Sequence, residues 1–500
     1  MKNIIKRISA LLAGVMVLCS QPLEVCAEKG YTYNYDWWED VQYSPDLYEV
    51  IGVFTASDLG ITDKFSSPQG LYVCGSTVYI CDTGNNRIVE MERTKFNNFS
   101  CKRIIDSFQG DVETTTFASP TDIAVSEDGY LYIADMNNGR ILKLDQDLNY
   151  VMQFDKPVDS TIDPSASFLP SKISIDTAGR VYCVATNINQ GLIKYENDGT
   201  FSGFVGATKV TYDWTDYLWK RLATKEQRAQ LASFVPTEYS NLYMDTEGFI
   251  YACTVNVTEE DLAAGNATPI RKLNLMGDDI LVRNGSFPVV GDLWWNGGTS
   301  GYDGPSLMTD ITALDNDIYV GLDRVRGRMF GYNDQGNLVF VFGGNGNMDG
   351  YFRQPAAIDH MGHDLLVLDS VDCSITLFAP TEFGGLVYDA IEQFQDGKYY
   401  ESGETWKQVM VQNGNYDLAY IGIGRSLLRQ EKYHEAMEYF ELKWDYKNYS
   451  KAFKQYRKEW VEEHIVMILL VLFLVICLPL FVGKVKKIKH EIDTADIFKV

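Results

Sequence analysis

Three aspartates that end apolar runs are each followed, five residues later, by an arginine. In the stretch CDTGNNR, Asp82 is separated from Arg87 by a turn rich in Gly and Asn. A carboxylate at such a place can accept hydrogen bonds from the backbone N–H groups of its turn, and the arginine can add a charge-assisted bond. The spacing therefore predicts a structural ion pair in each turn. The pairs are Asp82–Arg87, Asp135–Arg140 and Asp323–Arg328.

These aspartates belong to a strand-like segment that recurs along the 500-residue chain. Each copy follows a turn and an earlier apolar strand, and a Pro opens the first three units at a spacing of about 50 residues. A four-stranded unit cannot bury both of its faces alone, so short strands at this period indicate a radial array. Six copies predict a mostly β protein with a six-bladed β-propeller over 47–382. The copies are TVYICD (77–82), YLYIAD (130–135), RVYCVA (180–185), FIYACT (249–254), DIYVGLD (317–323) and DLLVLD (364–369).

The two ends of the repeated region predict how the ring closes. The sixth unit stops after its third strand, SITLFA (374–379), and LYEVIGVF (47–54) has the pattern of the missing fourth strand. We therefore expect the N-terminal strand to complete the last blade. Residues 28–46 form a lead-in to which the pattern assigns no element.

The full unit, P-x-(G/D)-(L/I)-x-V, a turn, (L/V)-Y-(I/V)-A-D and (N/G)-N-x-R-I, resembles the NHL repeat. The insertion WKRLATKEQRAQLASFVPTEYSN (219–241) also resembles a group of exported, membrane-anchored NHL proteins of Gram-positive bacteria. That resemblance implies a propeller held at the cell surface and suggests an association with a solute-uptake system.

The aspartates allow a second interpretation once they are placed on a propeller. A ring of carboxylates around the channel mouth could hold a cation such as Ca²⁺. Two blades offer Ala185 and Thr254 at the corresponding position, which favours the structural role. The ring would consist of Asp82, Asp135, Asp323 and Asp369, and otherwise no cofactor is expected.

Three insertions interrupt the period, at 207–235, 255–269 and 284–305. By the parity of the strands all three emerge on one face, which we expect to point away from the cell. Two carry aromatic rings, which suit sugar faces or a protein or peptide partner. The alternative is that the rings fold inward as small cores of their loops. The expected ligand-binding residues are Trp214, Trp219, Trp294, Trp295 and Tyr302.

Enzyme function is less favoured than binding. A zinc-dependent propeller lyase would need several His ligands, and the propeller region has only His360 and His363, which we expect to be solvated turn residues. No G-x-S-x-G elbow or phosphate loop is present. A hydrolase or lactonase that uses a channel-bound divalent cation remains the alternative.

The region 385–462 carries a second repeat, of 34 residues. Small, small and large residues at offsets of 12 and 4 are typical of tetratricopeptide repeats, because the small residues let paired helices approach and the large one fills the gap. This predicts a small helical stalk, which could also dock a neighbouring membrane protein. Ala390, Ser402 and Trp406 recur as Gly424, Ala436 and Phe440.

Both ends of the chain predict export and anchoring. Residues 1–27 have a basic start, an apolar stretch and a small-residue cleavage site, typical of a signal peptide. The uncharged run 465–483 is long enough to span a bilayer, and the basic segment KVKKIKH after it predicts that the tail 484–500 is cytoplasmic. The net charge of −24 without a basic cluster argues against a nucleic-acid partner. We expect a single-pass, cell-surface binding or scaffolding propeller with mostly buried, free cysteines.

Overall fold

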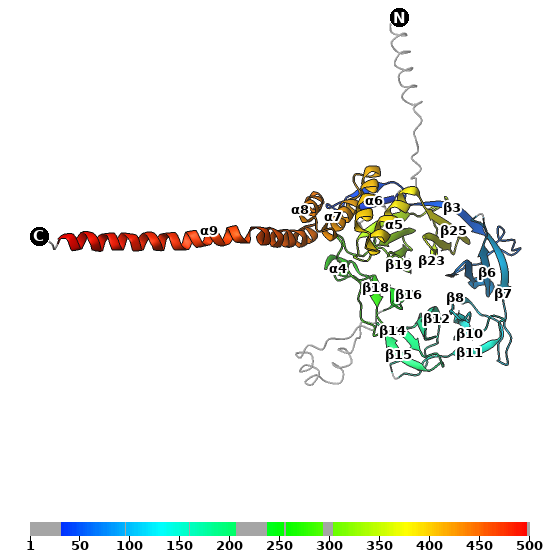
Figure 1. Cartoon of the computed structure of the whole chain (residues 1–500). Coiled ribbons are helices and arrows are strands. Elements are labelled where there is room, and N and C mark those ends of the chain that lie inside the picture. The colour runs from blue at the N-terminus through cyan, green and yellow to red at the C-terminus, as the bar shows by residue number, and fades with distance from the viewer. Residues whose placement is uncertain are drawn as a thin grey trace, which may run out of the picture. The chain divides into compact units, whose positions relative to one another are not determined.

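The computed structural model describes residues 32–95, 97–159, 161–206, 238–254, 257–293 and 304–497. The chain divides into a β unit that ends at Gly385 and a helical unit that begins at Leu386. The β unit consists of six sheets arranged as a ring (Figure 1). The innermost strands of neighbouring blades contact one another around the whole ring. The six-bladed β-propeller is therefore confirmed.

The first three blades each have four antiparallel strands in chain order from the channel outward. Blade one is β4 (Gly70–Cys74), β5 (Thr77–Asp82), β6 (Arg87–Arg93) and β7 (Phe99–Ile105). Blade two is β8 (Pro120–Val125), β9 (Leu131–Asp135), β10 (Arg140–Leu144) and β11 (Tyr150–Phe154). Blade three is β12 (Pro170–Ile175), β13 (Val181–Ala185), β14 (Ile188–Tyr195) and β15 (Phe201–Val205).

The other three blades depart from this plan in strand number, counted over the described residues. Blade four is β16 (Tyr239–Met244), β17 (Ile250–Thr254) and β18 (Ile270–Leu273), with the short helix α4 (Glu259–Ala263) between the last two. Blade five is β19 (Met308–Ala313), β20 (Tyr319–Asp323), β21 (Arg328–Tyr332) and β22 (Leu338–Gly343), followed by two N-terminal strands. Blade six is β23 (Pro355–Met361), β24 (Asp364–Asp369) and β25 (Ser374–Pro380), followed by β3 (Tyr48–Thr55).

The N-terminal strand closes the ring as the sequence predicts. β3 pairs antiparallel with β25, with Phe54 opposite Ile375. The lead-in residues also form structure, which the sequence pattern does not predict. β1 (Thr32–Tyr35) and β2 (Val41–Ser44) form a hairpin, and β1 pairs with β22 at the outer edge of blade five. The N-terminal region therefore contributes to two blades.

The repeated apolar segment forms the second strand of each blade. All five residues of β9, Leu131–Asp135, are buried, as are those of β13 and β20. Such strands lie between the faces of neighbouring sheets, so they are apolar on both sides instead of alternating. The hydrophobic clusters accordingly combine residues of adjacent blades, for example Ile123 with Ile88.

The helical unit consists of antiparallel helices in which small residues face large ones. Ser402 and Ala390 are fully buried, and the Ser402 hydroxyl donates to the Ala390 carbonyl at 2.7 Å. A Cβ atom on Gly424 would lie 2.6 Å from the Phe440 ring. The predicted small and large positions therefore do pack helix against helix. The helices are α5 (Glu382–Gln395), α6 (Tyr399–Gln412), α7 (Asp417–Arg429), α8 (Tyr433–Leu442) and α9 (Tyr446–Ile497).

Helix α9 is continuous from the packed helices through the apolar run. The part of α9 from Tyr446 to Thr494, 49 residues, includes a window of mean hydropathy 3.4 and is long and apolar enough to cross a membrane. The start of α9 contacts α8, and Ala452 is fully buried there. The residues that pack against α8 and those predicted as a membrane span thus belong to one helix.

Candidate functional site

Two of the predicted Asp–Arg pairs form, at the turns between the second and third strands of blades one and two. Asp135 is fully buried, and one of its oxygens accepts from the Ala118 N–H at 2.7 Å. The other oxygen accepts from Asn138 Nδ2 at 2.8 Å and from Arg140 Nε at 2.9 Å. Asp82 has equivalent contacts with the Ser66 N–H, Asn85 and Arg87. These carboxylates tie the turn to the entry of their own blade.

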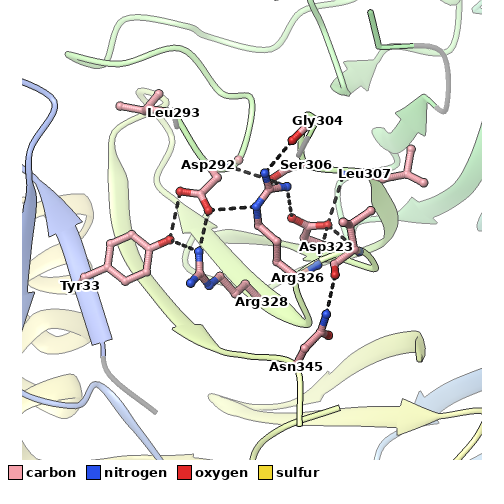
Figure 2. A network of polar contacts seen from close by, with 12 residues as sticks. Tyr33, Asp292, Leu293, Gly304, Ser306, Leu307, Asp323, Arg326, Arg328 and Asn345 are labelled. Carbon is pink, nitrogen blue, oxygen red and sulfur yellow. Dashed lines mark hydrogen bonds and ion pairs between the residues drawn. The ribbon is translucent and has the colours of Figure 1, made fainter. Parts of the chain in front are cut away.

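The third pair does not form. Asp323 accepts from the backbone N–H groups of Leu307 and Val325, and its charged neighbour is Arg326 at 3.5 Å. Arg328, which the spacing assigns to Asp323, instead lies 2.6 Å from Asp292 (Figure 2). The reason is that Asp292, from the insertion before blade five, brings a second buried carboxylate within reach of Arg328.

The fourth predicted carboxylate, Asp369, accepts four backbone N–H groups, at 2.7 to 2.8 Å. Asp82, Asp135, Asp323 and Asp369 therefore each bind protein donors within their own blade. Across the described residues, no three His, Cys, Asp or Glu side chains are grouped so that they could hold a metal ion. The geometry favours the structural role, and Ca²⁺ binding stays a prediction.

Asp292 connects the lead-in hairpin to blade five. It is buried and contacts Arg328 at 2.6 Å and Arg326 at 3.2 Å (Figure 2). The Tyr33 hydroxyl donates to it at 3.2 Å, and the Tyr35 hydroxyl donates to the same oxygen. Burial and the nearby Asp292 charge raise the pKa of both tyrosines, so both hydroxyls stay protonated donors.

A polar cavity of about 340 Å³ lies at one end of the central channel, and we refer to it as the mouth cavity. Its wall combines the entries of innermost strands with loops between second and third strands, and residues of five blades line it. These two kinds of loop therefore share one end of the propeller, as the strand parity predicts. The polar lining includes Gln69, Ser171, Lys172, Thr186, Asn189, Glu238, Ser240, Thr309, Arg324, Gln354 and Ser370.

Lys172 forms the floor of the mouth cavity. Its side chain extends from blade three toward blade one, where its ammonium donates to the Gln69 carbonyl at 3.2 Å. It lies 3.9 Å from Asp122, and its side chain is 13% exposed. Lys172 also lines a second, smaller cavity of about 110 Å³ in the channel. The lysine therefore separates the two cavities.

Two buried carboxylates, one on blade two and one on blade five, influence this lysine. Asp122 accepts from the Ile173 N–H at 2.8 Å, and Asp310 accepts from the Ile358 N–H at 2.7 Å, so each connects two blades. Burial, opposed by the Lys172 charge, raises the pKa of Asp122 to about 6 and that of Asp310 to about 7. Both carboxyls therefore titrate near neutral pH.

The smaller cavity lies among polar side chains from further along the innermost strands. Thr312 Oγ1 is 2.7 Å from His360 Nδ1 and donates to Asp359 at 3.2 Å. The His360 side chain is 12% exposed, so the expectation that it is a solvated turn residue is wrong. It lies on β23 and packs toward Tyr243 of blade four, because the strand continues further than the turn signal suggests.

The aromatic residues expected to bind ligand lie outside the described residues. These are Trp214, Trp219, Trp294, Trp295 and Tyr302. Their role stays a prediction. The mouth and channel residues were not predicted, although a signal is present at the third residue of the innermost strand in blades two to six, where the repeats differ. That position is occupied by Asp122, Lys172, Asn241, Asp310 and Ala357.

Comparisons with known proteins give one distant sequence relative. No family model matches the chain. A probable peptidyl-alpha-hydroxyglycine alpha-amidating lyase of Caenorhabditis elegans is 26% identical over 132 residues, which is 25% of this chain and 36% of that protein. The match thus spans about a third of the relative's length.

The solved structures similar to this chain include two at 11% identity. One is virginiamycin B lyase from Staphylococcus aureus, with a TM-score of 0.38 over 66% of this chain and 99% of that one. The other is hydrazine synthase of Kuenenia stuttgartiensis, with a TM-score of 0.36 over 64% and 97%.

Proposed function

We propose that this protein is a membrane-anchored binding or scaffolding propeller that holds a small polar ligand in its mouth cavity. The observation that carries the proposal is the cavity of about 340 Å³, whose wall presents hydroxyl, amide and charged groups from five blades. Binding pockets for small ligands typically have volumes of about 300–1,000 Å³ and a few convergent polar groups. A monosaccharide or the end of a peptide is the size of ligand that fits.

The proposal includes export and anchoring. Residues 1–27 would be removed as a signal peptide, and 465–483 would cross the membrane with the basic tail in the cytoplasm. The propeller would then be an extracellular array of NHL-type repeats. Support comes from the apolar window of α9.

The helical unit gives the scaffolding part of the proposal. Its 34-residue period and the packing of Gly424 against Phe440 support a tetratricopeptide-like stalk. Such helices commonly stack into surfaces that bind proteins. A neighbouring membrane protein, such as a subunit of a solute-uptake system, is the partner we propose for it.

A thermal-shift screen tests ligand binding on the full chain in lipid nanodiscs. The panel contains sugars, sugar acids and short peptides, each with and without a chelator. We expect at least one ligand to raise the unfolding temperature in both conditions. Thr309→Tyr, which places a ring in the mouth cavity, should abolish the shift, whereas the exposed Thr200→Tyr should keep it. If Thr309→Tyr leaves the shift intact, the mouth cavity is not the binding site.

The second candidate is a propeller lyase or another propeller enzyme with a bound cation. The similarity to the amidating lyase is the observation in its favour, over 132 residues. Incubation of the full chain with a peptidyl-α-hydroxyglycine should then release the amidated peptide, and a chelator should stop the reaction. Lack of turnover with added divalent metal ions would remove the lyase, and the hydrolase or lactonase alternative would then be tested with ester and lactone substrates in the same way.

A further inference from the structure

We propose that the mouth cavity is specific for a hydroxylated carboxylic acid, such as a sugar acid. Lys172 and Arg324 would contact the ligand's carboxylate, and oxygen atoms of the cavity wall would accept hydrogen bonds from its hydroxyl groups. The inference rests on the proposed function, because it assigns a ligand class to the same cavity.

Lys172 has hydrogen-bonding capacity that the described residues do not use. An ammonium group carries three N–H donors. One donates to the Gln69 carbonyl at 3.2 Å, while the Asp122 oxygen at 3.9 Å is beyond hydrogen-bond distance. An anionic acceptor above the lysine would satisfy the remaining donors. A carboxylate is such an acceptor, and charge-assisted bonds of this kind are stronger than neutral ones.

Arg324 supplies a second cation at the side of the cavity. It lies in the turn between β20 and β21, where its backbone N–H donates to the Leu307 carbonyl at 3.0 Å. Its side chain is exposed, lines the cavity and has no protein partner in the described part of the chain. A guanidinium group can bind both oxygens of one carboxylate, which adds geometric selectivity.

The wall of the cavity provides hydrogen-bond acceptors for the hydroxyl groups of a ligand. The Ser171 hydroxyl donates to the Val184 carbonyl at 3.1 Å, and the Ser240 hydroxyl donates to the Met308 carbonyl at 3.1 Å. Each hydroxyl has one hydrogen, so toward the cavity both serines can only accept. Asn189 Oδ1 is a buried acceptor without a donor among the described residues, and it lies in the same lining. Hydroxyl groups of a ligand satisfy all three.

The buried carboxylates decide how strongly the lysine attracts an anion. Burial lowers the pKa of Lys172, but the charges of Asp122 and Asp310 outweigh burial and raise it, so the ammonium stays protonated. When both aspartates are ionised they offset the positive field at the cavity floor. Lowering the pH from 8 to 5.5 adds protons to them, since their pKa values are about 6 and about 7.

The other titratable groups near the lysine do not reverse this direction. The Cys81 thiol, which also faces Lys172, is fully buried and its pKa is raised by that burial, so it stays neutral. Asp359 acts on Asp122 and raises its pKa further. Glu238 is an acidic residue that lines the cavity. A carboxylic acid ligand stays ionised at pH 5.5, because ordinary carboxyl pKa values lie near 4. Binding should therefore strengthen as the pH falls.

Calorimetry with the full chain in nanodiscs tests the inference with three probes. D-glucuronate carries both chemistries, D-glucose lacks the carboxylate, and inorganic phosphate lacks the hydroxylated carbon skeleton. We expect D-glucuronate to bind at least about 10-fold more tightly than either of the others, and more tightly at pH 5.5 than at pH 8. Lys172→Gln should weaken its binding by about 10- to 100-fold, the loss expected for a bond to a charged group.

Arg324→Gln keeps the test decisive if Lys172→Gln fails to fold. Arg324 is exposed, so its loss should leave the fold intact and weaken D-glucuronate binding by roughly 3- to 10-fold. The matched control is Arg353→Gln, which removes an arginine that pairs with Asp372 and does not line the cavity. Binding by this variant should equal that of the unmodified chain.

Two results would overturn the inference while leaving the proposed function standing. Equal affinity for D-glucose and D-glucuronate would show a sugar site that does not recognise the acid. Equal affinity for phosphate and D-glucuronate would show a simple anion site. A complete absence of D-glucuronate binding would overturn the inference as well, and the wider ligand panel would then decide the proposed function separately.

Discussion

Replacement of Asp135 by Asn distinguishes a structural turn from a cation site. The change keeps the size of the side chain but removes the charge that Arg140 faces at 2.9 Å, with both side chains less than a tenth exposed. An amide NH₂ group would also meet Asn138 and Arg140, which are donors. Loss of one partner of a buried ion pair costs about 3–5 kcal/mol. At roughly 2–4 °C per kcal/mol, Asp135→Asn should lower the unfolding temperature by about 6–20 °C.

The assay is thermal unfolding of the full chain in nanodiscs, with chelator and with added Ca²⁺. If the turn is structural, the unfolding temperature of the unmodified protein is the same in both conditions. The exposed Asp147→Asn, in the same blade, should change stability by less than about 0.5 kcal/mol. In a double-mutant cycle with Arg140→Gln, we expect a coupling energy of about 2 kcal/mol.

Either of two results would refute the structural reasoning. One is a Ca²⁺-dependent rise in unfolding temperature that Asp135→Asn abolishes. The other is a coupling energy near zero between Asp135 and Arg140, which would mean that the 2.9 Å contact does not stabilise the turn.

Three further predictions concern stability. The free energy of unfolding should rise as the pH falls from 8 to 5. The folded-state pKa values of Asp122 and Asp310, about 6 and about 7, exceed those of the unfolded chain, so the folded state takes up more protons. Urea denaturation at stepped pH measures this stability, and a fall in stability would contradict the prediction. Gly424→Ala should destabilise the helical unit by about 1–3 kcal/mol, because the new methyl group would lie 2.6 Å from the Phe440 ring. Gly403→Ala, whose Cβ has no neighbour closer than 3.4 Å, should be neutral or stabilising. Thermal unfolding followed by circular dichroism at 222 nm measures both variants. Tyr35→Phe should lower the free energy of unfolding by about 1–2 kcal/mol and speed proteolysis of the lead-in hairpin, since it removes the hydroxyl that donates to the buried Asp292. An unchanged cleavage rate would show that this hydrogen bond does not hold the hairpin to blade five.

The number of blades and the closing strand could be predicted because both depend on local pattern. The buried second strand gives a run such as YLYIAD in every unit. The sixth unit ends with its third strand at 374–380, so its fourth strand has to come from elsewhere in the chain. The hairpin β1–β2 could not be predicted in this way. Its partner, β22, lies about 300 residues further along the chain, and short strands take much of their stability from packing against such a partner.

The same limit explains the wrong partner of Arg328. The spacing from Asp323 is identical to that of the pairs that do form. What differs is Asp292, which comes from an insertion without a repeat pattern and competes for the guanidinium from outside the blade. The Asp–Arg spacing within one repeat carries no information about a carboxylate that comes from another segment of the chain.

The mouth cavity shows which positions of a repeated fold are free to carry function. The turn aspartates recur in four blades because each of them accepts backbone hydrogen bonds within its own blade, so these oxygens are already occupied by the fold. In five blades the strand pairing skips the second residue of the innermost strand, and the third residue follows directly after this bulge. Four of these third residues line the smaller channel cavity, namely Asp122, Lys172, Asn241 and Asp310. The five equivalent places carry acidic, basic, amide and apolar side chains, and Lys172 is the one cation among them. A site whose equivalent positions carry different residue types suits an asymmetric ligand. Its residues can be found in the sequence as the positions at which the repeats differ in residue type.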